Sequence, residues 1–486
     1  MDTAAATRQH DNANDRHIPP EDRVPVSQKI GYGLGSVLDM WGHWLYPNLM
    51  GQVFNIFLGV SANLIGTATL LIKLFDAAAD PLFGWLSDNT RSRFGRRRPF
   101  ILVGAVLAGI GLPLMMAVPQ GWSEMQYFWF IIISNAIFIP IMSCFFMPYQ
   151  SLGSELTPNY HERTSVMSYR GAIQKVPELA LFFTAQFTTL AIWNDEITGK
   201  PNILKAAQVY TAGLGVIMII VGVVMFFLLR ERYYDKVVSR RQEHISIRET
   251  LWQTLKCKPF RIQLSMKLAY AMGTSMVSAL GYYNTVYYVC KGDLNAAGKW
   301  NFFMGVAGMV FGFMGIPTFA YLARRLGKRH AMAIILTAAI GAFVTTWWLY
   351  NPNHPWMQIF ATGLIAFTGA GFWMLDGSIT ADVVDYDELE TAKRREGAFA
   401  SCGSWIMKVG VAVGAAASFY ILAATGFDAK LGGDQTERTL TMIRVLLVVI
   451  PVVGLLLALL ALSRFRLTQQ ALSDIRGQLE ARRGKV

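Results

Sequence analysis

The sequence has few charged residues and few cysteines. Only 16% of its 486 residues are charged, against about 25% in typical soluble domains, whereas 53% are hydrophobic. The cysteines show no spacing typical of a metal site or a redox pair, and the chain contains no H-E-x-x-H motif and no nucleotide-binding loop. We therefore expect packing cysteines, no metal and no cofactor. The four cysteines are Cys144, Cys257, Cys290 and Cys402.

The chain contains many long apolar runs. About 20 apolar residues cross the hydrocarbon core of a bilayer as a helix, and the 43 glycines are compatible with packed membrane helices. No β pattern of similar strength competes. The sequence therefore predicts an all-α membrane protein with twelve transmembrane helices. The runs lie near 29–58, 61–87, 99–118, 125–152, 166–194, 205–229, 262–290, 298–323, 330–350, 356–384, 400–424 and 440–463.

The net charge of +12 is concentrated in alternate loops. Lys and Arg cluster after the second, sixth, eighth and tenth runs, whereas 119–124 and 351–355 contain neither. Basic loops remain in the cytoplasm, so this pattern predicts that both termini are cytoplasmic. The basic residues lie only at helix ends, and we expect no binding of nucleic acid.

Loops at equal positions of the two halves are similar. "FGWLSDNTRSRFGRRR" after the second run parallels "FAYLARRLGKRH" after the eighth, and "SELTPNYHERTSV" parallels "YDELETAKRREGAF". Such duplication predicts two pseudo-symmetric six-helix bundles around a site near the membrane midplane. The predicted segments are a disordered N-terminus at 1–27, bundles at 28–230 and 261–463, a central loop at 231–260 and a basic tail at 464–486.

The central loop contains "ISIRETLWQTL", whose apolar residues lie on one face of a helix. This pattern predicts either a short amphipathic helix at the cytoplasmic membrane surface or a solvated linker.

The second run contains two carboxylates, Asp76 and Asp80, one helical turn apart. A charge at the bilayer centre costs at least about 2.5–3.5 kcal/mol, and two neighbouring acids cost more unless a proton or cation joins them. Pro81 removes the hydrogen-bond donor of the Ala77 carbonyl, which then becomes a third ligand, and Ser143 is a fourth candidate. The pair predicts a site for a monovalent cation. In the alternative interpretation, Lys73 simply neutralises Asp76.

These motifs carry a family resemblance. "DAAADPLFGWLSDNTRSRFGRRRP" and "DVVDYDELETAKRREG" resemble the loops after helices 2 and 10 of the glycoside–pentoside–hexuronide:cation symporters, the melibiose permease family of the major facilitator superfamily. The "SRFGRRRPFI" portion also resembles plant sucrose carriers. The resemblance implies loops that control the conformation of the bundles. Their motif residues here are Asp88, Arg93, Gly95, Arg96, Arg97, Asp385 and Arg395.

The resemblance also implies roles for single residues. Asp76 and Asp80 match the acids that bind the coupling cation, but Ala79 replaces a frequent asparagine, which favours H+ over Na+. Lys408 matches a lysine that faces these acids, and we expect it to couple cation and substrate. Arg170 matches the arginine that contacts the sugar, where its fork can hold two hydroxyls or a carboxylate.

The substrate site departs from the family pattern. Phe146 stands where the family has a sugar-binding acid, and Gln150 stands where it has a tryptophan. The family's other sugar-binding acid, in the first helix, has no counterpart at the matching position, and the nearest acid, Asp39, lies one residue before it. The loss of an anion favours an acidic or a larger substrate, unless Asp376 and Glu178 restore the balance. Aromatic side chains are candidates either for stacking on sugar rings or for ordinary packing. They include Tyr149, Trp373 and Trp405.

We therefore expect a sugar:cation symporter of the bacterial inner membrane that works by alternating access as a monomer. Its expected partners are a glycoside, oligosaccharide or uronide, a monovalent cation (H+ or Na+) and the lipid bilayer. One alternative is a carrier of lysophospholipids or other amphiphiles on the same fold. Another is a transporter-like sensor or a membrane enzyme, although no catalytic motif or soluble output domain is present.

Overall fold

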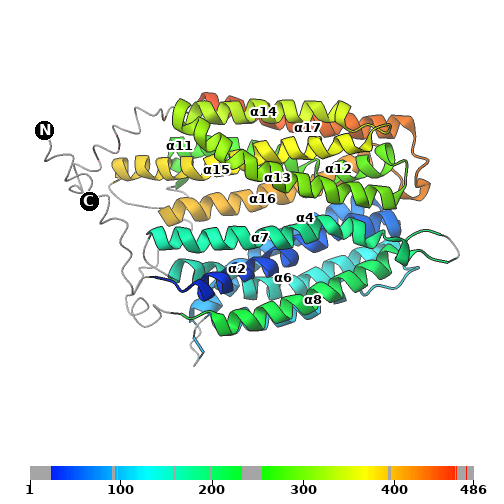
Figure 1. Ribbon diagram of the computed structural model, residues 1–486, viewed down its shortest axis with the longest axis horizontal. Helices are drawn as coiled ribbons and strands as arrows, with labels where there is room; N and C mark the ends of the chain where they lie inside the picture. The colour runs from blue at the N-terminus through cyan, green and yellow to red at the C-terminus, as the bar shows by residue number, and fades with distance from the viewer. Residues whose placement is uncertain are drawn as a thin grey trace.

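The computed structural model describes residues 23–89, 94–95, 97–156, 160–196, 199–231, 254–391 and 396–465, with 467, 475 and 478. Nearly all of this part is helical (Figure 1). A single isolated bridge pairs Asn194 with Pro201 in one loop of the described chain.

Six long helical segments form the N-terminal half. The first is interrupted by two segments of wider π-helix, and the others are continuous. The segments are α2–η1–α3–η2 (Val26–Met40, Trp41–Leu45, Tyr46–Met50, Gly51–Phe57), α4 (Ala62–Asn89), α5 (Arg98–Leu114), α6 (Glu124–Glu155), α7 (Tyr160–Thr188) and α8 (Ile203–Leu228), with the short η3 (Ala191–Trp193).

Six more form the C-terminal half, and again the first is interrupted by a π-helix near its end. This irregularity in equivalent helices is consistent with internal duplication. The segments are α11–α12–η4 (Lys258–Ser275, Ser278–Tyr283, Asn284–Val289), α13 (Leu294–Leu326), α14 (Lys328–Leu349), α15 (Gln358–Thr391), α16 (Glu396–Ala424) and α17 (Glu437–Ser463), with η5 (Pro355–Met357) and η6 (Ala429–Leu431).

Local sequence sets several helix starts. Ser123 and Gln126 form a capping box at α6, in which each side chain satisfies a backbone N–H of the first turn. The side chains of Asp293 and Thr436 accept hydrogen bonds from N–H groups at the starts of α13 and α17.

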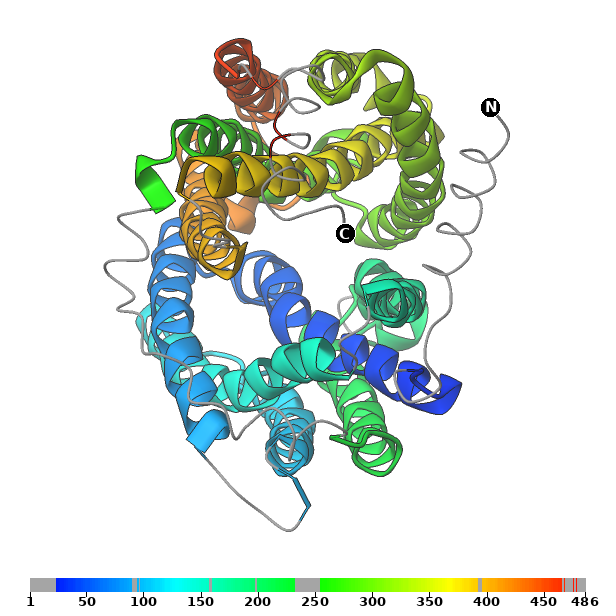
Figure 2. The same ribbon diagram turned by 90° about the vertical axis from the view of Figure 1, so that its left-hand side faces the viewer.

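The helices gather into two bundles, as an end-on view shows (Figure 2). Helices α4 and α16 pack against each other across the boundary, as do α7 and α13. Glycines allow this approach: a Cβ at Gly66 would lie 3.1 Å from the Ala416 carbonyl oxygen, and one at Gly298 would lie 2.7 Å from that of Ala185. Small residues at membrane helix contacts let backbones come close.

The contacts between the bundles continue at the end opposite the start of α2. Thr67 on α4 is hydrogen-bonded to Tyr420 on α16, and Tyr283 of α12 donates to Asn55 of η2. Both links lie near the helix ends that face away from the start of α2 (Figure 1). The halves are therefore held together at that end of the molecule.

The predicted fold class, an all-α membrane protein of two pseudo-symmetric bundles, is confirmed. Within the described residues, seven helices are long and apolar enough to cross a membrane, namely α6, α8, α13, α14, α15, α16 and α17. Crossing by the remaining five segments, which include the charged α4, α7 and α11, stays a prediction. Helix α17 ends at the end of the molecule where α2 begins (Figure 1).

Small differences concern the predicted boundaries. The first helix begins at Val26 and the seventh at Lys258, a few residues before the predicted starts of the bundles. The amphipathic segment of the central loop lies almost wholly outside the described residues, as does most of 1–27 and of the tail.

Candidate functional site

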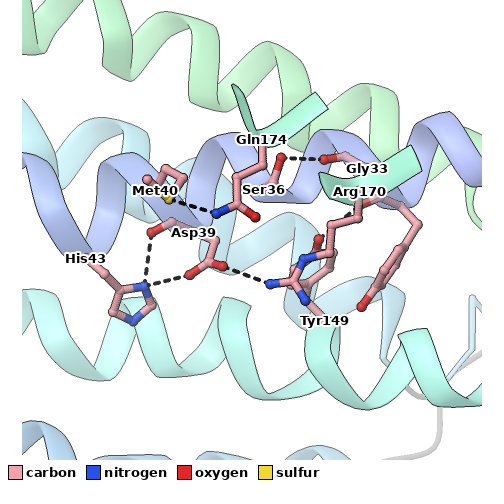
Figure 3. Close-up of polar contacts among 9 residues, drawn as sticks. Gly33, Ser36, Asp39, Met40, His43, Tyr149, Arg170 and Gln174 are labelled. Carbon is pink, nitrogen blue, oxygen red and sulfur yellow. Dashed lines mark hydrogen bonds and ion pairs between the residues drawn. The ribbon is translucent and has the colours of Figure 1, made fainter. Parts of the chain in front are cut away.

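An ion pair between α2 and α7 forms the centre of a polar cluster in the N-terminal bundle. The Arg170 guanidinium donates from Nη2 to Asp39 Oδ2 at 3.0 Å, and both side chains are largely buried. Asp39 therefore reaches the predicted sugar-binding arginine despite its displaced sequence position (Figure 3). The Nε of Arg170 is buried and has no hydrogen-bond partner among the described residues, which leaves a donor for a ligand.

Tyr149 supports the arginine instead of offering a free face. The guanidinium lies 5.4 Å from the centroid of its ring, within cation–π range. The ring is fully buried and stacks on Tyr32 at 4.7 Å and on Phe145 at 5.3 Å, while its hydroxyl donates to the Tyr32 carbonyl at 3.0 Å. Stacking of a sugar on Tyr149 is therefore not available in this structure, because its faces are already covered.

His43 joins this cluster from the next turn of the same segment. Its Nδ1 lies 3.2 Å from Asp39 Oδ1 and 3.1 Å from the Asp39 carbonyl oxygen. The carboxylate of Asp39 thus lies between an imidazole and a guanidinium (Figure 3). The ring of His43 also contacts Phe146 edge-on at 4.8 Å.

The predicted cation acid Asp76 lines a small cavity with His43. The cavity measures about 40 Å³, enough for a water molecule or a small cation. Lys73 lies on the same wall, and its Nζ is 4.0 Å from Asp76 Oδ2, so the charge-neutralising interpretation also has structural support. Buried Ser143 follows Met142, which lines the cavity. The side chains of Asp80 and Ala77 lie outside the described residues.

Phe146 connects the two bundles at the position of the missing sugar-binding acid. The Nζ of Lys408, on α16, lies 5.8 Å from the centroid of its ring, and His43 contacts the same ring. The predicted coupling lysine, Lys408, therefore lies beside this ring, at the edge of the N-terminal cluster that contains His43.

A second charged cluster lies in the C-terminal bundle. The Nζ of Lys267, on α11, lies 2.8 Å from Oδ2 of Asp376 on α15. Gln263 donates to Asp376 Oδ1 at 3.0 Å and to Thr380 at 2.7 Å. Asp376 is therefore the partner of a lysine that the sequence interpretation missed, and its predicted contact with substrate stays a prediction.

The predicted aromatic residues of this half differ in their surroundings. Trp373 lines a cavity of about 300 Å³ together with Lys267 and is 45% exposed. Trp405 is also exposed, but it is not part of the cavity lining. Gln150, on α6, is half-buried.

Lys175 and Glu178, three residues apart on one face of α7, form an ion pair. Their Nζ and Oε2 atoms are 2.6 Å apart on α7. Glu178 and Asp376 thus each neutralise a neighbouring lysine, and it is Asp39 that balances the charge of Arg170.

The loop motif between α4 and α5 is attached to the end of α8. Glu231 accepts hydrogen bonds from the backbone N–H groups of Arg97 and Arg98 at 2.7 and 3.0 Å, at the positive end of the α5 dipole. Gly95 has φ +104°, a conformation that favours glycine. Arg97 is buried and Asp385 half-buried. The side chains of Asp88, Arg93, Arg96 and Arg395 lie outside the described residues.

His43, Gln263 and Lys267 are the site residues that sequence reasoning missed. A signal was present for two of them. Lys267 lies inside the predicted run 262–290, where a charge is as costly as at Lys408, and His43 is four residues after Asp39, on the same helix face.

Two helical bundles with charged clusters inside and contacts across a common boundary define a secondary transporter. The chain belongs to the MFS/sugar transport protein family, whose model matches residues 31–469.

Relatives cover nearly the whole chain. It is 26% identical to a putative glycoside/cation symporter of Escherichia coli over 94% of this chain and 95% of that protein. It is 24% identical to the isoprimeverose transporter of Lactiplantibacillus pentosus, over 91% and 89%. A solved nucleoside transporter, 12% identical, matches 91% of this chain and 99% of its own with a TM-score of 0.59, which shows the shared fold.

Proposed function

We propose that the protein is a symporter that moves a neutral sugar into the cell together with H+ by alternating access. We place it in the bacterial inner membrane with both termini in the cytoplasm, acting as a monomer and not as an enzyme. The relatives named for glycosides and for isoprimeverose support a sugar as the substrate. The polar, charge-balanced clusters favour a hydroxylated substrate over an amphiphile.

The shared carboxylate of Asp39 is the observation that carries this proposal. It connects Arg170, the sugar-contacting candidate, with His43, whose ring lines the cavity of Asp76. A proton that enters the cavity adds positive charge beside Asp39 and strengthens its contact with His43. The carboxylate then holds Arg170 less tightly, and the guanidinium donors become available to sugar hydroxyls.

The groups around His43 fit a proton better than a larger cation. Asp39 lies on its own segment, Asp76 and Lys73 lie on α4, and Lys408 lies across Phe146 on α16. Helix α6 contributes Asn135 and apolar side chains to the cavity. The ammonium of Lys73, 4.0 Å from Asp76, repels either cation, but a proton, unlike Na+, needs no coordination shell.

Proteoliposomes test the proposal directly. Sugar uptake against a gradient should follow an imposed pH gradient (inside alkaline) and not an imposed Na+ gradient. Asp76→Asn should abolish accumulation while sugar exchange across the membrane persists. Uptake driven by Na+ alone, or full accumulation by Asp76→Asn, would show that the proposed coupling is wrong.

A further inference from the structure

A cavity of about 300 Å³ lies inside the C-terminal bundle, among α11, α15 and α16. This volume is at the lower end of the range for small-molecule sites. Its lining combines polar and aromatic side chains, including Gln263, Lys267, Trp373, Thr380 and Ser404. The Arg170 cluster belongs to the other bundle, so this cavity is a separate feature of the molecule.

The polar wall of the cavity has fixed geometry and one unsatisfied acceptor. Gln263 is 3% exposed, and its amide nitrogen donates to the carboxylate and carbonyl of Asp376 and to Thr380. These bonds fix the amide, and its Oε1 is buried with no hydrogen-bond partner among the described residues. A buried acceptor without a partner is costly, and a ligand hydroxyl that reaches it from the cavity would satisfy it.

Trp373 provides an aromatic face beside this wall. Its ring is held edge-on by Tyr270 at 5.9 Å and by Phe372 at 5.4 Å, yet 45% of the residue remains exposed. The Nζ of Lys267 lies 5.6 Å from its centroid. A pyranose ring has an apolar C–H face and a rim of hydroxyls, and it can pack on an indole while its rim reaches polar groups.

The charge of the cluster selects for a neutral ring. The ammonium of Lys267 is already balanced by Asp376 at 2.8 Å, and that carboxylate is buried. An incoming carboxylate or phosphate would meet this second negative charge, whereas a hydroxyl can donate to one member of the pair and accept from the other.

The two clusters lie at similar depth in their bundles. Arg170 lies ten residues into α7 and Lys267 nine residues into α11, which corresponds to about 15 Å from the helix starts at 1.5 Å per residue. Both helices begin at the same end of the molecule (Figure 1). The two clusters therefore lie at a similar level of the molecule, as a single ligand that contacts both would require.

We propose that Lys267, Asp376, Gln263 and Trp373 form a second sugar subsite, which binds the second, neutral ring of a disaccharide or longer saccharide whose first ring is held by Arg170 and Asp39. This inference rests on the proposed transport of sugars. It assigns the specificity for saccharide length to the C-terminal bundle.

Equilibrium binding to the purified full-length protein tests the subsite. The probes are glucose with maltose and cellobiose, galactose with lactose, and xylose with xylobiose. The wild-type protein should bind at least one disaccharide about tenfold or more tightly than its monosaccharide. The double variant Lys267→Met/Asp376→Leu leaves no unpaired charge. It should reduce the disaccharide advantage to less than about threefold, while its monosaccharide affinity stays within about threefold of the wild-type value.

Two further variants distinguish a specific loss of the subsite from a general loss of stability. Lys328→Met/Asp382→Leu removes another lysine–aspartate pair of the same bundle, between α14 and α15, and should retain the disaccharide advantage. Trp373→Ala changes a half-exposed position and should lose the advantage even if the first double variant does not fold.

The outcomes are distinguishable. If the wild-type protein binds no sugar of the panel, the proposed function fails, and the subsite fails with it. If wild type binds sugars without preference for any disaccharide, or if the Trp373→Ala variant and the folded double variant keep the preference, only the subsite is wrong.

Discussion

Arg170 and Asp39, 131 positions apart in the sequence, form an ion pair with 3.0 Å between Nη2 and Oδ2. The pair joins α7 to α2 and lies beside the ring of Tyr149. Its carboxylate also contacts His43. In the proposed mechanism, a change at either member would therefore affect the binding of both the sugar and the proton.

The fork of Arg170 should be essential for sugar binding. Arg170→Lys keeps the charge but replaces a planar fork by a single ammonium, and the loss of one charged hydrogen bond costs about 1.5–3 kcal/mol. We expect sugar affinity to fall about ten- to hundredfold in equilibrium binding. The control Arg444→Lys changes an arginine of α17 that donates to the Trp347 carbonyl. Its sugar affinity should stay within twofold of the wild-type value. Equal effects of the two variants would exclude direct contact by Arg170.

His43 should set the pH dependence of sugar affinity. A protonated imidazole competes with Arg170 for Asp39, so sugar should bind more tightly at low pH and more weakly as the proton leaves. Between low and high pH we expect an about three- to tenfold change in the sugar Kd of wild type and little change in His43→Gln. His354→Gln, at an exposed loop position, is the control. A pH dependence that survives in His43→Gln would contradict this role.

Much of this architecture could be predicted from the sequence, because apolar length and the distribution of basic loops constrain a membrane protein strongly. The chemical types of the site residues could also be predicted, since charges in apolar helices are costly. The pairings between these side chains could not be predicted from the sequence. Asp39 with Arg170 and Lys267 with Asp376 depend on how separate helices pack. The burial of Tyr149, which removes it as a stacking face, also comes from neighbouring helices.

Gly95 should be needed for the attachment of the loop between α4 and α5 to the end of α8. A Cβ at this position would lie 2.5 Å from Glu231 Oε1, and φ is +104°. Gly95→Ala therefore adds a steric clash to a backbone cost of about 1–2 kcal/mol. Gly121→Ala is a matched control, because Gly121 has φ +89° with no atom within 4 Å of a Cβ. We expect Gly95→Ala to lower the unfolding temperature and the uptake rate more than Gly121→Ala does, and equal effects would exclude a specific role for the contact.

Lys408 lies where the proposed cation site and the proposed sugar site approach each other. It lies on α16, which packs against α4, the helix of Asp76. Its ammonium lies over Phe146, whose ring also contacts His43. An ammonium near the acids of α4 stabilises the empty site, and an arriving cation competes with it for the same carboxylates. Cation binding would then release Lys408 and change the contact between the bundles.

This competition predicts that Lys408→Ala weakens the mutual dependence of the two ligands more than it weakens either ligand alone. A coupling free energy of about 1–3 kcal/mol makes each ligand favour the other by 5- to 150-fold, and the effect is reciprocal. The measurement is sugar affinity at a pH that saturates the cation site and at one that empties it, in wild type and in Lys408→Ala. We expect the gain on protonation to fall toward unity in the variant. If both proteins gain equally, Lys408 does not couple the sites, and coupling must pass through His43 and Asp39 within the N-terminal bundle alone.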